Sequence, residues 1–569
     1  MPTKVKALCF VFSSCSMLYY LLLTRLVVEF TGDVMRWSAI SSGVYLCTLG
    51  LGMIWSERPF KRNLFALVAW IEAAIAVWGT LAVALIYLWH IVYRIHIFQF
   101  GYDLGDFSFD QRWVFGAGAE LLLVVLGLLS GLEFGLVNQM GFRAGLASVQ
   151  ALIAVYQFGG LLGSILLLLV FAPHFEPLHI AIGMSVVNLA AALAWAMAFR
   201  QRLEARPAAR LLAMHGAALA AVSLLALRVD LPQVHRKNFY YNTYHWAISG
   251  QGIVSYFFPV GVRAWFNEAA KYPAVERFQS VYQNIDFVRE SPVRPVQVEV
   301  PAGDGWTMFM DHHFQVSSEY EVDYHQAMAH VPSMLLDQGD QGVARKPSKV
   351  LIIGGGDGLL VRELLRQGPD IEHITLIDID PEILRLASEH RDLLRLNHAA
   401  LEDPKVTVMA ADAFQAVRGS VETFDQIFVD VLFPFNFETS RLYSAEFFTA
   451  LHHHLSPQGS LAILSPVAAT DVDDLTEQRG LGVLASTFKY AGFNDLYLYG
   501  ETRHSFFLAL PRAATEDFAV KPLAKSKYMR LVQHPQEMAP VHHVVVPLET
   551  ALVNSILSPT FFGVHDTFF

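Results

Sequence analysis

Long hydrophobic segments alternate with short polar ones over the first 230 residues. About seven of them approach or exceed the roughly 20 residues with which an α-helix crosses a bilayer. They are Ala7–Phe30, Ser38–Trp55, Leu64–Val92, Val114–Val137, Ala144–Ala172, Leu178–Phe199 and Leu211–Leu227, the last being the shortest. The pattern predicts an all-α transmembrane bundle over residues 1–230.

The pattern changes in the second half, where short apolar strands alternate with helical segments. The segments are Val350–Ile353, Val361–Leu365, Ile374–Asp378, Pro381–Arg391, Val406–Met409, Gln426–Val429, Ala445–Leu455 and Leu461–Leu464. Such repeats predict an α/β, Rossmann-like domain of the class I methyltransferase type, with its ligand at the strand ends. Short strands with Pro and Gly breaks between Gln283 and Gln315 predict a small β lobe in front of it.

These patterns divide the chain into five parts. We expect a multi-pass membrane domain over 1–230, an aromatic-rich linker over 231–276 and the small β lobe over 277–345. The Rossmann-like domain follows over 346–525, and residues 526–569 form a tail that we leave unassigned.

Composition narrows the function classes. At 54% hydrophobic and 16% charged residues the chain is too apolar for a soluble enzyme. A net charge of −11 gives no basis for nucleic-acid binding. All three cysteines fall in expected spans, so we predict no disulfide framework, and no Cys/His spacing suggests zinc or another metal.

Basic residues mark one side of the spans and predict a multi-pass protein of the cell membrane. They precede the first span and follow the second, fourth and sixth, as Lys4, Lys6, Arg58, Lys61, Arg62, Arg143, Arg200, Arg202, Arg206 and Arg210. Because cytoplasmic loops are rich in Lys and Arg, we expect the N-terminus in the cytoplasm. Seven crossings would put the second half outside, whereas the supply of a cytosolic cofactor favours a cytoplasmic site. Both alternatives remain open.

A glycine-rich turn follows the first strand of the α/β domain. Gly354, Gly356 and Gly358 form GxGxG, and Asp357 lies among them. Glycine allows close approach of the backbone to a ligand, and the helix that follows offers free N–H groups. An aspartate there opposes a pyrophosphate, so the turn favours an adenosine-bearing sulfonium over a dinucleotide.

Three more acids fall where strands should end. Asp378 lies about twenty residues after the glycines, where a carboxylate can accept from ribose hydroxyls. Asp412 is placed to meet an adenine amino group, and Asp430 to face the substrate. Each alone is equally well read as a helix N-cap or a solvated turn. Three at successive strand ends favour a site.

Residues 279–511 resemble the polyamine aminopropyltransferases, the spermidine synthase family. The matching blocks are Tyr282-Gln283, Asp311-His-His-Phe-Gln315, Tyr324-His325, Gly354-Gly-Gly-Asp-Gly358, Asp378-Ile-Asp380-Pro, Asp412-Ala413-Phe and Leu442-Tyr-Ser-Ala-Glu-Phe447. The first half resembles that of bacterial members with a fused membrane domain, around Glu133 and Tyr156–Ser164.

The resemblance implies transfer of the aminopropyl group of decarboxylated S-adenosylmethionine to a small amine or polyamine, releasing methylthioadenosine. It also implies a homodimer. It implies donor contacts at Gln283, Gln315, Tyr324, His325, Gly354, Gly356, Asp357, Gly358, Asp378, Asp412 and Ala413. Asp430 matches the family's catalytic aspartate. The acceptor would meet Tyr324, Asp357, Asp430 and Tyr499.

Two residues bear on which donor and which acceptor the site would select. Asp357 would hold the ammonium group of the aminopropyl arm and repel the extra carboxylate of ordinary S-adenosylmethionine. The family's second acid after the catalytic aspartate is replaced by Phe433, which cannot pair with a cationic acceptor. The acceptor is then an amine other than putrescine, is held by Glu438 or another acid, or the activity has been lost.

Charged residues within the expected spans leave another function open. Arg25, Glu72, Glu120 and Glu133 either line a route for polycations or form structural ion pairs. We therefore keep two alternatives to the enzyme: a polyamine transporter or sensor with a non-catalytic synthase-like domain, and a methyltransferase using ordinary S-adenosylmethionine.

Overall fold

The structure is a computed structural model. It describes residues 2–31, 34–58, 63–93, 112–144, 148–202, 230–242, 270–289, 305–319, 321–336, 348–366, 371–431, 437–465, 475–500, 505–511, 542–543 and 553–556, with isolated residues between 210 and 224. The chain divides into two compact units. The first, called the bundle unit, holds Met1–Arg277 with Ser291–Val298, and the second, called the polar unit, holds Phe278–Glu290 with Glu299–Phe569.

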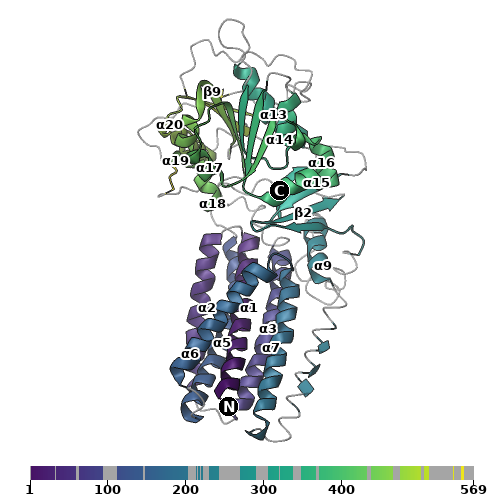
Figure 1. Ribbon diagram of the computed structural model, residues 1–569, viewed down its shortest axis with the longest axis vertical. Helices are drawn as coiled ribbons and strands as arrows, with labels where there is room; N and C mark the ends of the chain where they lie inside the picture. Colours follow the sequence, from purple (N-terminus) through teal and green to yellow (C-terminus); the bar gives the residue numbers. More distant parts are fainter. Residues whose placement is uncertain are drawn as a thin grey trace. The chain divides into compact units, whose positions relative to one another are not determined.

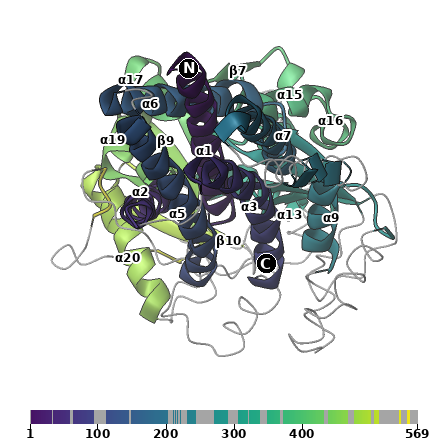
Figure 2. The same ribbon diagram turned by 90° about the horizontal axis from the view of Figure 1, so that it is seen from below.

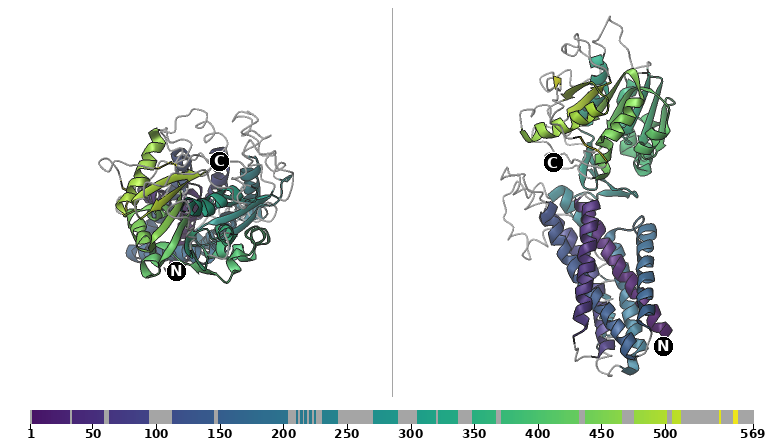
Figure 3. Two further views of the ribbon diagram at one scale, coloured as in Figure 1. Left: turned by 90° about the horizontal axis from the view of Figure 1, so that it is seen from above. Right: turned by 90° about the vertical axis from the view of Figure 1, so that its left-hand side faces the viewer.

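Six long helices form the bundle unit and run alongside one another (Figures 1 and 3). They are α1 (Pro2–Thr31), α2 (Val34–Ser56), α3 (Leu64–Val92), α5 (Arg112–Ala144), α6 (Val149–Leu166) and α7 (Pro177–Ala198). A π-helical turn, η2 (Leu167–Phe171), extends α6. In the described part of the chain these six are long and apolar enough to cross a membrane. The expected seventh span lies largely outside the described residues.

Helix α1 lies in the middle of the bundle, as the view along the helices shows (Figure 2), and contacts the other five. Cys9, Phe12 and Leu18 on it are fully buried. Helix α6 approaches closely, because a Cβ atom on Gly163 would lie 2.4 Å from the main-chain oxygen of Ser14. Small residues thus allow the tight helix packing expected within a membrane.

The expected linker begins differently from the prediction. Residues 231–242 are helical, as α9 (Leu231–Lys237) and the π-helical turn η4 (Asn238–Asn242). Phe239, Tyr240 and Tyr241 are buried rather than interfacial. The Phe239 ring stacks 5.1 Å from His90 of α3, so the start of the expected linker packs on the bundle unit.

Contacts of α9 fix the end of the bundle at which this segment lies. His235 packs against His90 near the end of α3, with ring centroids 5.8 Å apart, and His90 stacks on Phe30 in the last turn of α1 at 3.9 Å. At the opposite end, Phe199 after α7 packs 4.7 Å from Phe65 at the start of α3. Phe199 and α9 therefore lie at opposite ends of the bundle.

The polar unit starts with the predicted small β lobe. Its four strands pair in the order β1 (Glu276–Gln279), β2 (Asn284–Arg289), β3 (Trp306–Met310) and β4 (His313–Ser317). Asp311 and His312 adopt positive φ in the tight turn between β3 and β4. The Asp311 carboxylate stabilises the turn by accepting from the backbone N–H of Asn284 at 2.8 Å. Helix α13 (Glu321–Leu336) follows.

An eight-stranded sheet forms the rest of the polar unit, in the order β12-β10-β11-β9-β8-β5-β6-β7. The parallel strands are β5 (Lys349–Gly354), β6 (His373–Asp378), β7 (Val406–Ala410), β8 (Phe424–Asp430) and β9 (Leu455–Leu464). Strands β10 (Asp495–Gly500), β11 (Ser505–Leu510) and β12 (His542–His543) complete it with antiparallel pairs. The predicted fold class is confirmed.

Helices cover both faces of this sheet (Figure 1). One face packs on α13 and α14 (Leu359–Arg366), and the other on α19 (Ala445–His453) and α20 (Leu475–Tyr490). Along β5, Val350 and Ile352 face the first layer while Leu351 and Ile353 face the second. Burial on both faces explains why this strand is apolar throughout.

The remaining helices connect the strands at the edges. They are α15 (Pro381–Glu389), α16 (Arg391–Asn397), α17 (Ala413–Gly419) and α18 (Phe437–Ser440), with 3₁₀ turns η3 (Arg200–Arg202) in the bundle unit and η5 (Ala400–Glu402) and η6 (Arg441–Tyr443) here. Part of the unassigned tail also packs into this unit. Asn554 is fully buried and donates from its amide to the main-chain oxygens of Ser440 and Tyr443, both at 3.0 Å.

Candidate active site

The predicted acids meet at one edge of the parallel sheet. Gly354 at the end of β5 is in register with Asp430, the last residue of β8. Asp378 ends β6 on the other side of β5 and is in register with Ala410 of β7. Since the carboxyl ends of parallel strands share an edge, one ligand can contact all of these positions.

The glycine-rich turn holds this edge together. Gly354, Gly355 and Gly358 have positive φ, and the Gly355 N–H donates to the main-chain oxygen of Asp430 at 3.1 Å. A Cβ atom on Gly354 would lie 2.1 Å from that oxygen, and one on Gly356 would lie 2.6 Å from the Asp378 carboxylate. Only glycine allows these strand ends to approach so closely.

Asp357 has a structural role within the same turn. One carboxylate oxygen accepts from the backbone N–H of Leu359 at 2.9 Å, at the start of α14. The Asp357 main-chain oxygen accepts from the Asn397 amide, also at 2.9 Å. The side chain is half-buried, and its hydrogen bond to Leu359 supports the turn-stabilising interpretation, while a ligand contact stays a prediction.

Asp430 is bound to a residue from another element. The Tyr324 hydroxyl on α13 donates to one oxygen of the Asp430 carboxylate at 2.6 Å. Burial raises the pKa of Asp430, the His325 imidazolium opposes this, and the Asp357 carboxylate adds to it. Burial and the Asp430 charge also raise the pKa of Tyr324, so the phenol stays a donor.

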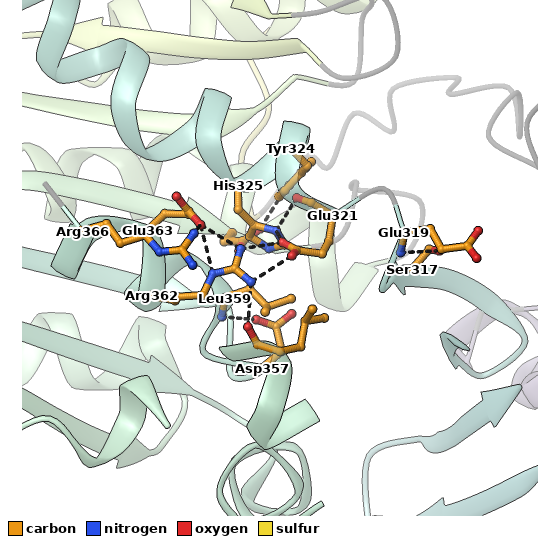
Figure 4. A network of polar contacts seen from close by, with 12 residues as sticks. Ser317, Glu319, Glu321, Tyr324, His325, Asp357, Leu359, Arg362, Glu363 and Arg366 are labelled. Atoms are coloured by element: carbon orange, nitrogen blue, oxygen red, sulfur yellow. Dashed lines mark hydrogen bonds and ion pairs between the residues drawn. The ribbon is translucent and has the colours of Figure 1, made fainter. Parts of the chain in front are cut away.

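A buried charged network supports the other side of α13 (Figure 4). The Arg362 guanidinium donates to both oxygens of Glu321, at 2.9 and 2.8 Å, and to Glu363 at 3.0 Å. Glu321 in turn accepts from Nδ1 of His325 at 3.0 Å. Bidentate geometry of this kind fixes the carboxylate in place.

The network sets the charge of His325. Burial disfavours the imidazolium, but the hydrogen bond to Glu321 and the charge of Asp357 outweigh it and raise the pKa of His325 to about 9. Burial likewise acts against the Glu321 carboxylate, while His325 and Arg362 lower the pKa of Glu321 to about 2. His325 therefore brings a positive charge to an edge rich in carboxylates.

Asp380, for which we predicted no role, links the segments that hold Asp378 and Gln283. Asp378 accepts from the backbone N–H groups of Gly356 at 3.0 Å and Asp380 at 2.9 Å. Burial raises the pKa of Asp378 to about 6 despite these bonds. The Gln283 amide donates to the fully buried Asp380 carboxylate at 2.9 Å, as does the Ser280 hydroxyl at 2.8 Å.

The Asp412 carboxylate already has partners within the protein. It caps α17 by accepting from the backbone N–H of Phe414 at 2.9 Å, and it pairs with Arg441 at 2.5 Å. Although burial acts the other way, Arg441 lowers the pKa of Asp412. Ala413, the first residue of α17, is buried. The helix N-cap reading of Asp412 therefore holds in the structure.

Two predicted residues stand apart from the cluster in their contacts. Gln315 on β4 makes a long 3.5 Å contact with the main-chain oxygen of His313. Tyr499 on β10 is fully buried, and its hydroxyl has no hydrogen-bond partner in the described residues. Its ring reaches Tyr324 only through Phe506, which lies 5.5 Å from Tyr499 and 5.2 Å from Tyr324.

Sequence reasoning missed the residues that hold the site in place. Glu321 and Arg362 lie 41 positions apart, and nothing in their sequence context marks them as a pair. Asp380 had a signal, because it occurs in the motif Asp378-Ile-Asp380-Pro. Phe433 and the Glu438 side chain, on which the acceptor depends, lie outside the described residues.

Known proteins are similar to this chain over most of its length. Residues 321–469 match the family model "Spermine/spermidine synthase domain". The chain is 27% identical to the polyamine aminopropyltransferase of Oceanobacillus iheyensis over 470 residues, which cover 81% of this chain and 77% of that one. It is also 27% identical to the polyamine aminopropyltransferase of Leptospira interrogans, over 82% of this chain and 79% of that one. Matches of this length extend beyond the polar unit into the bundle unit.

Solved structures give weaker likenesses. One is a spermidine synthase in complex with the transition state analogue AdoDATO, which is 24% identical with a TM-score of 0.37 and covers 47% of this chain and 85% of that one. Another, spermidine synthase from Thermotoga maritima, is 23% identical with a TM-score of 0.34, over 47% of this chain and 84% of that one.

The sequence matches confirm the predicted resemblance. The chain carries a spermine/spermidine synthase domain and is an enzyme of the transferase class. More particularly, it is a relative of the bacterial polyamine aminopropyltransferases.

We predict that Glu321→Gln lowers the pKa of His325 from about 9, because its main hydrogen-bonding anion is lost. Histidine NMR of the labelled full chain, assigned with His325→Gln, measures this. In the wild type, Glu321 contributes stability above its ordinary pKa of 4.5, lost as pH falls toward about 2. His325 contributes stability below 6.5, lost as pH rises through about 9.

The thermal stability difference between the wild type and Glu321→Gln should therefore be largest between about pH 4.5 and 6.5. Glu382→Gln is the matched control, because Glu382 pairs with Arg385 at an exposed site. A His325 that titrates at the same pH with and without Glu321 would contradict the network.

Proposed function

We propose that this chain is a membrane-bound aminopropyltransferase. It transfers the aminopropyl group of decarboxylated S-adenosylmethionine to an amine and releases methylthioadenosine. The observation that carries the proposal is the 2.6 Å hydrogen bond from Tyr324 to Asp430 beside the glycine-rich turn. This contact joins α13 to the strand edge at which a donor would lie.

The residues at the edge fit such a donor. A carboxylate has about four acceptor positions, so Asp378 can still accept from ribose hydroxyls while it holds two backbone N–H groups. Gly354 and Gly356 let the strand ends approach one another closely, because a Cβ atom at either position would meet Asp430 or Asp378. Asp412 and Ala413 would lie at the adenine, and Asp357 at the ammonium of the aminopropyl arm.

Five further residues would complete the donor and acceptor sites. Gln283, Gln315 and His325 would contact the donor, and Tyr324 and Tyr499 would line the acceptor site. His325 supports this arrangement because its positive charge offsets part of the repulsion among the carboxylates.

In the reaction, the amine nitrogen would use its lone pair to form a bond to the propyl carbon next to sulfur. The carbon–sulfur bond breaks, and its electron pair neutralises the sulfonium to give the thioether. The proton displaced from nitrogen passes to Asp430 and then to solvent. A raised pKa makes Asp430 a better proton acceptor than an ordinary aspartate.

Tyr324 would act as a positioning residue for this base. Its hydroxyl occupies one oxygen of Asp430, and the other oxygen, Oδ2, lies against the glycine turn, 3.1 Å from where a Gly355 Cβ would be. The amine is thereby directed to one side of the carboxylate. Orientation of this kind can lower the barrier substantially.

The activity test supplies the full-length protein with decarboxylated S-adenosylmethionine and amines from diamines to hydrophobic monoamines. We expect methylthioadenosine with at least one amine, and loss of at least about a hundredfold in rate for Asp430→Asn, with donor binding retained. Asp425→Asn is the control, because Asp425 lies at the opposite end of β8 and binds backbone N–H groups.

The best amine would identify the acceptor, which Phe433 leaves open between diamines and more apolar amines. Donor binding without methylthioadenosine from any amine would contradict the enzyme and favour a polyamine transporter or sensor. Turnover that survives Asp430→Asn would remove Asp430 from the mechanism.

We further propose that the chain leaves the bundle on the side of the membrane opposite its N-terminus. The support is that Phe199 packs on the start of α3 whereas His235 packs near its end, so the two lie at opposite ends of the bundle. Helix α7 alone is about 33 Å long at 1.5 Å per residue. Basic loops put the N-terminus in the cytoplasm, so the polar unit would lie on the outer face. Its donor would then have to be supplied there.

Reporter fusions test this orientation. We expect a reporter fused after Arg202 to be active in the cytoplasm and one fused after Asn242 to be active outside, because the intervening segment crosses. Reporters that are active on the same side at both positions would contradict the crossing. The activity proposed for the polar unit is tested separately by the methylthioadenosine assay.

A further inference from the structure

Two carboxyl groups face each other inside the bundle unit. Glu72 lies on α3 and is 0% exposed, and Glu133 lies on α5 and is 1% exposed. Their carboxyl groups lie close enough to interact electrostatically with each other. Neither belongs to the candidate active site in the polar unit.

The described hydrogen-bond donors around this pair do not satisfy all of its buried oxygens. The Tyr156 hydroxyl donates to Glu133, and the Asn188 amide donates to the main-chain oxygen of Glu72 at 3.2 Å. Both side-chain oxygens of Glu72 lack a donor in the described residues, and so does the side-chain oxygen of Asn188, which is itself fully buried.

No positive charge compensates the pair in the part of the chain that the structure describes. Neither Glu72 nor Glu133 has a described lysine, arginine or histidine acting on it, and the two acids act on each other. Two ionised carboxylates side by side in an apolar interior are strongly unfavourable. The pair must therefore share a proton or bind a cation.

A shared proton supplies one donor, which leaves at least two buried acceptors unsatisfied. An alkylammonium group has a positive charge, three N–H donors and no acceptor. We propose that Glu72 and Glu133, with Asn188, form a binding site for a primary alkylammonium group within the membrane bundle.

Binding would exchange one cation for another. In the empty site one proton is shared between the two carboxyl groups, which together carry one negative charge. When the ammonium binds, that proton leaves to solvent and both carboxyl groups are then ionised. The charge of the occupied site is unchanged, which avoids burying additional charge in the membrane.

The test titrates n-butylamine into the full-length protein in detergent, without donor, by calorimetry in two buffers of different ionisation enthalpy. We expect saturable binding with release of a proton for each amine bound. Glu72→Gln, Glu133→Gln and Asn188→Leu should each weaken it by about tenfold or more, since each removes a hydrogen bond to a charged group.

Glu120→Gln is the matched control, because Glu120 is also a buried acid of α5 but accepts from Ser41 at 2.5 Å. Asp430→Asn should leave the proton release unchanged, which separates this site from the proposed active site. Binding without proton release, the same loss in Glu120→Gln, or proton release on adding sodium alone would overturn the proposal. Asn188→Leu keeps the test valid if the carboxyl variants do not fold.

Discussion

Negative charge that has no arginine partner is the constraint on which both units depend. Several carboxylates of the polar unit are neutralised locally: Glu321 by Arg362, Glu363 by Arg366 and Asp412 by Arg441. At the strand edge, Asp430 is instead bound by a neutral phenol, and in the bundle Glu72 faces another acid. Because unpaired charge is costly to bury, such positions point to cationic ligands.

Much of the polar unit followed from local pattern. A run of apolar residues ending in glycine or aspartate predicts a parallel strand and its edge, so the sequence predicts Gly354, Asp378 and Asp430 at one edge of the sheet. The partners across space were not predictable. The pairs Glu321–Arg362 and Asp412–Arg441 depend on how α13, α14 and the strands pack, for which the sequence has no local signal.

The bundle unit shows the same division. Hydrophobic length predicted the six long helices to within a few residues, because a helix that is apolar over about 20 residues has a strong sequence signal. The burial of Phe239 and Tyr241 was missed, since aromatic residues suit an interface and a core equally well. Charged residues in the spans indicated function, but only packing distinguished Glu120, bonded to Ser41, from the Glu72–Glu133 pair.

We infer that the strand edge binds a cationic donor that has no carboxylate. Equilibrium binding is the most direct measurement of this preference. Decarboxylated and ordinary S-adenosylmethionine would be titrated separately into the wild type and Asp357→Asn. We predict that the wild type prefers the decarboxylated form by at least about tenfold, and that Asp357→Asn narrows this preference. Equal affinities in the wild type, or a preference unchanged in Asp357→Asn, would contradict it.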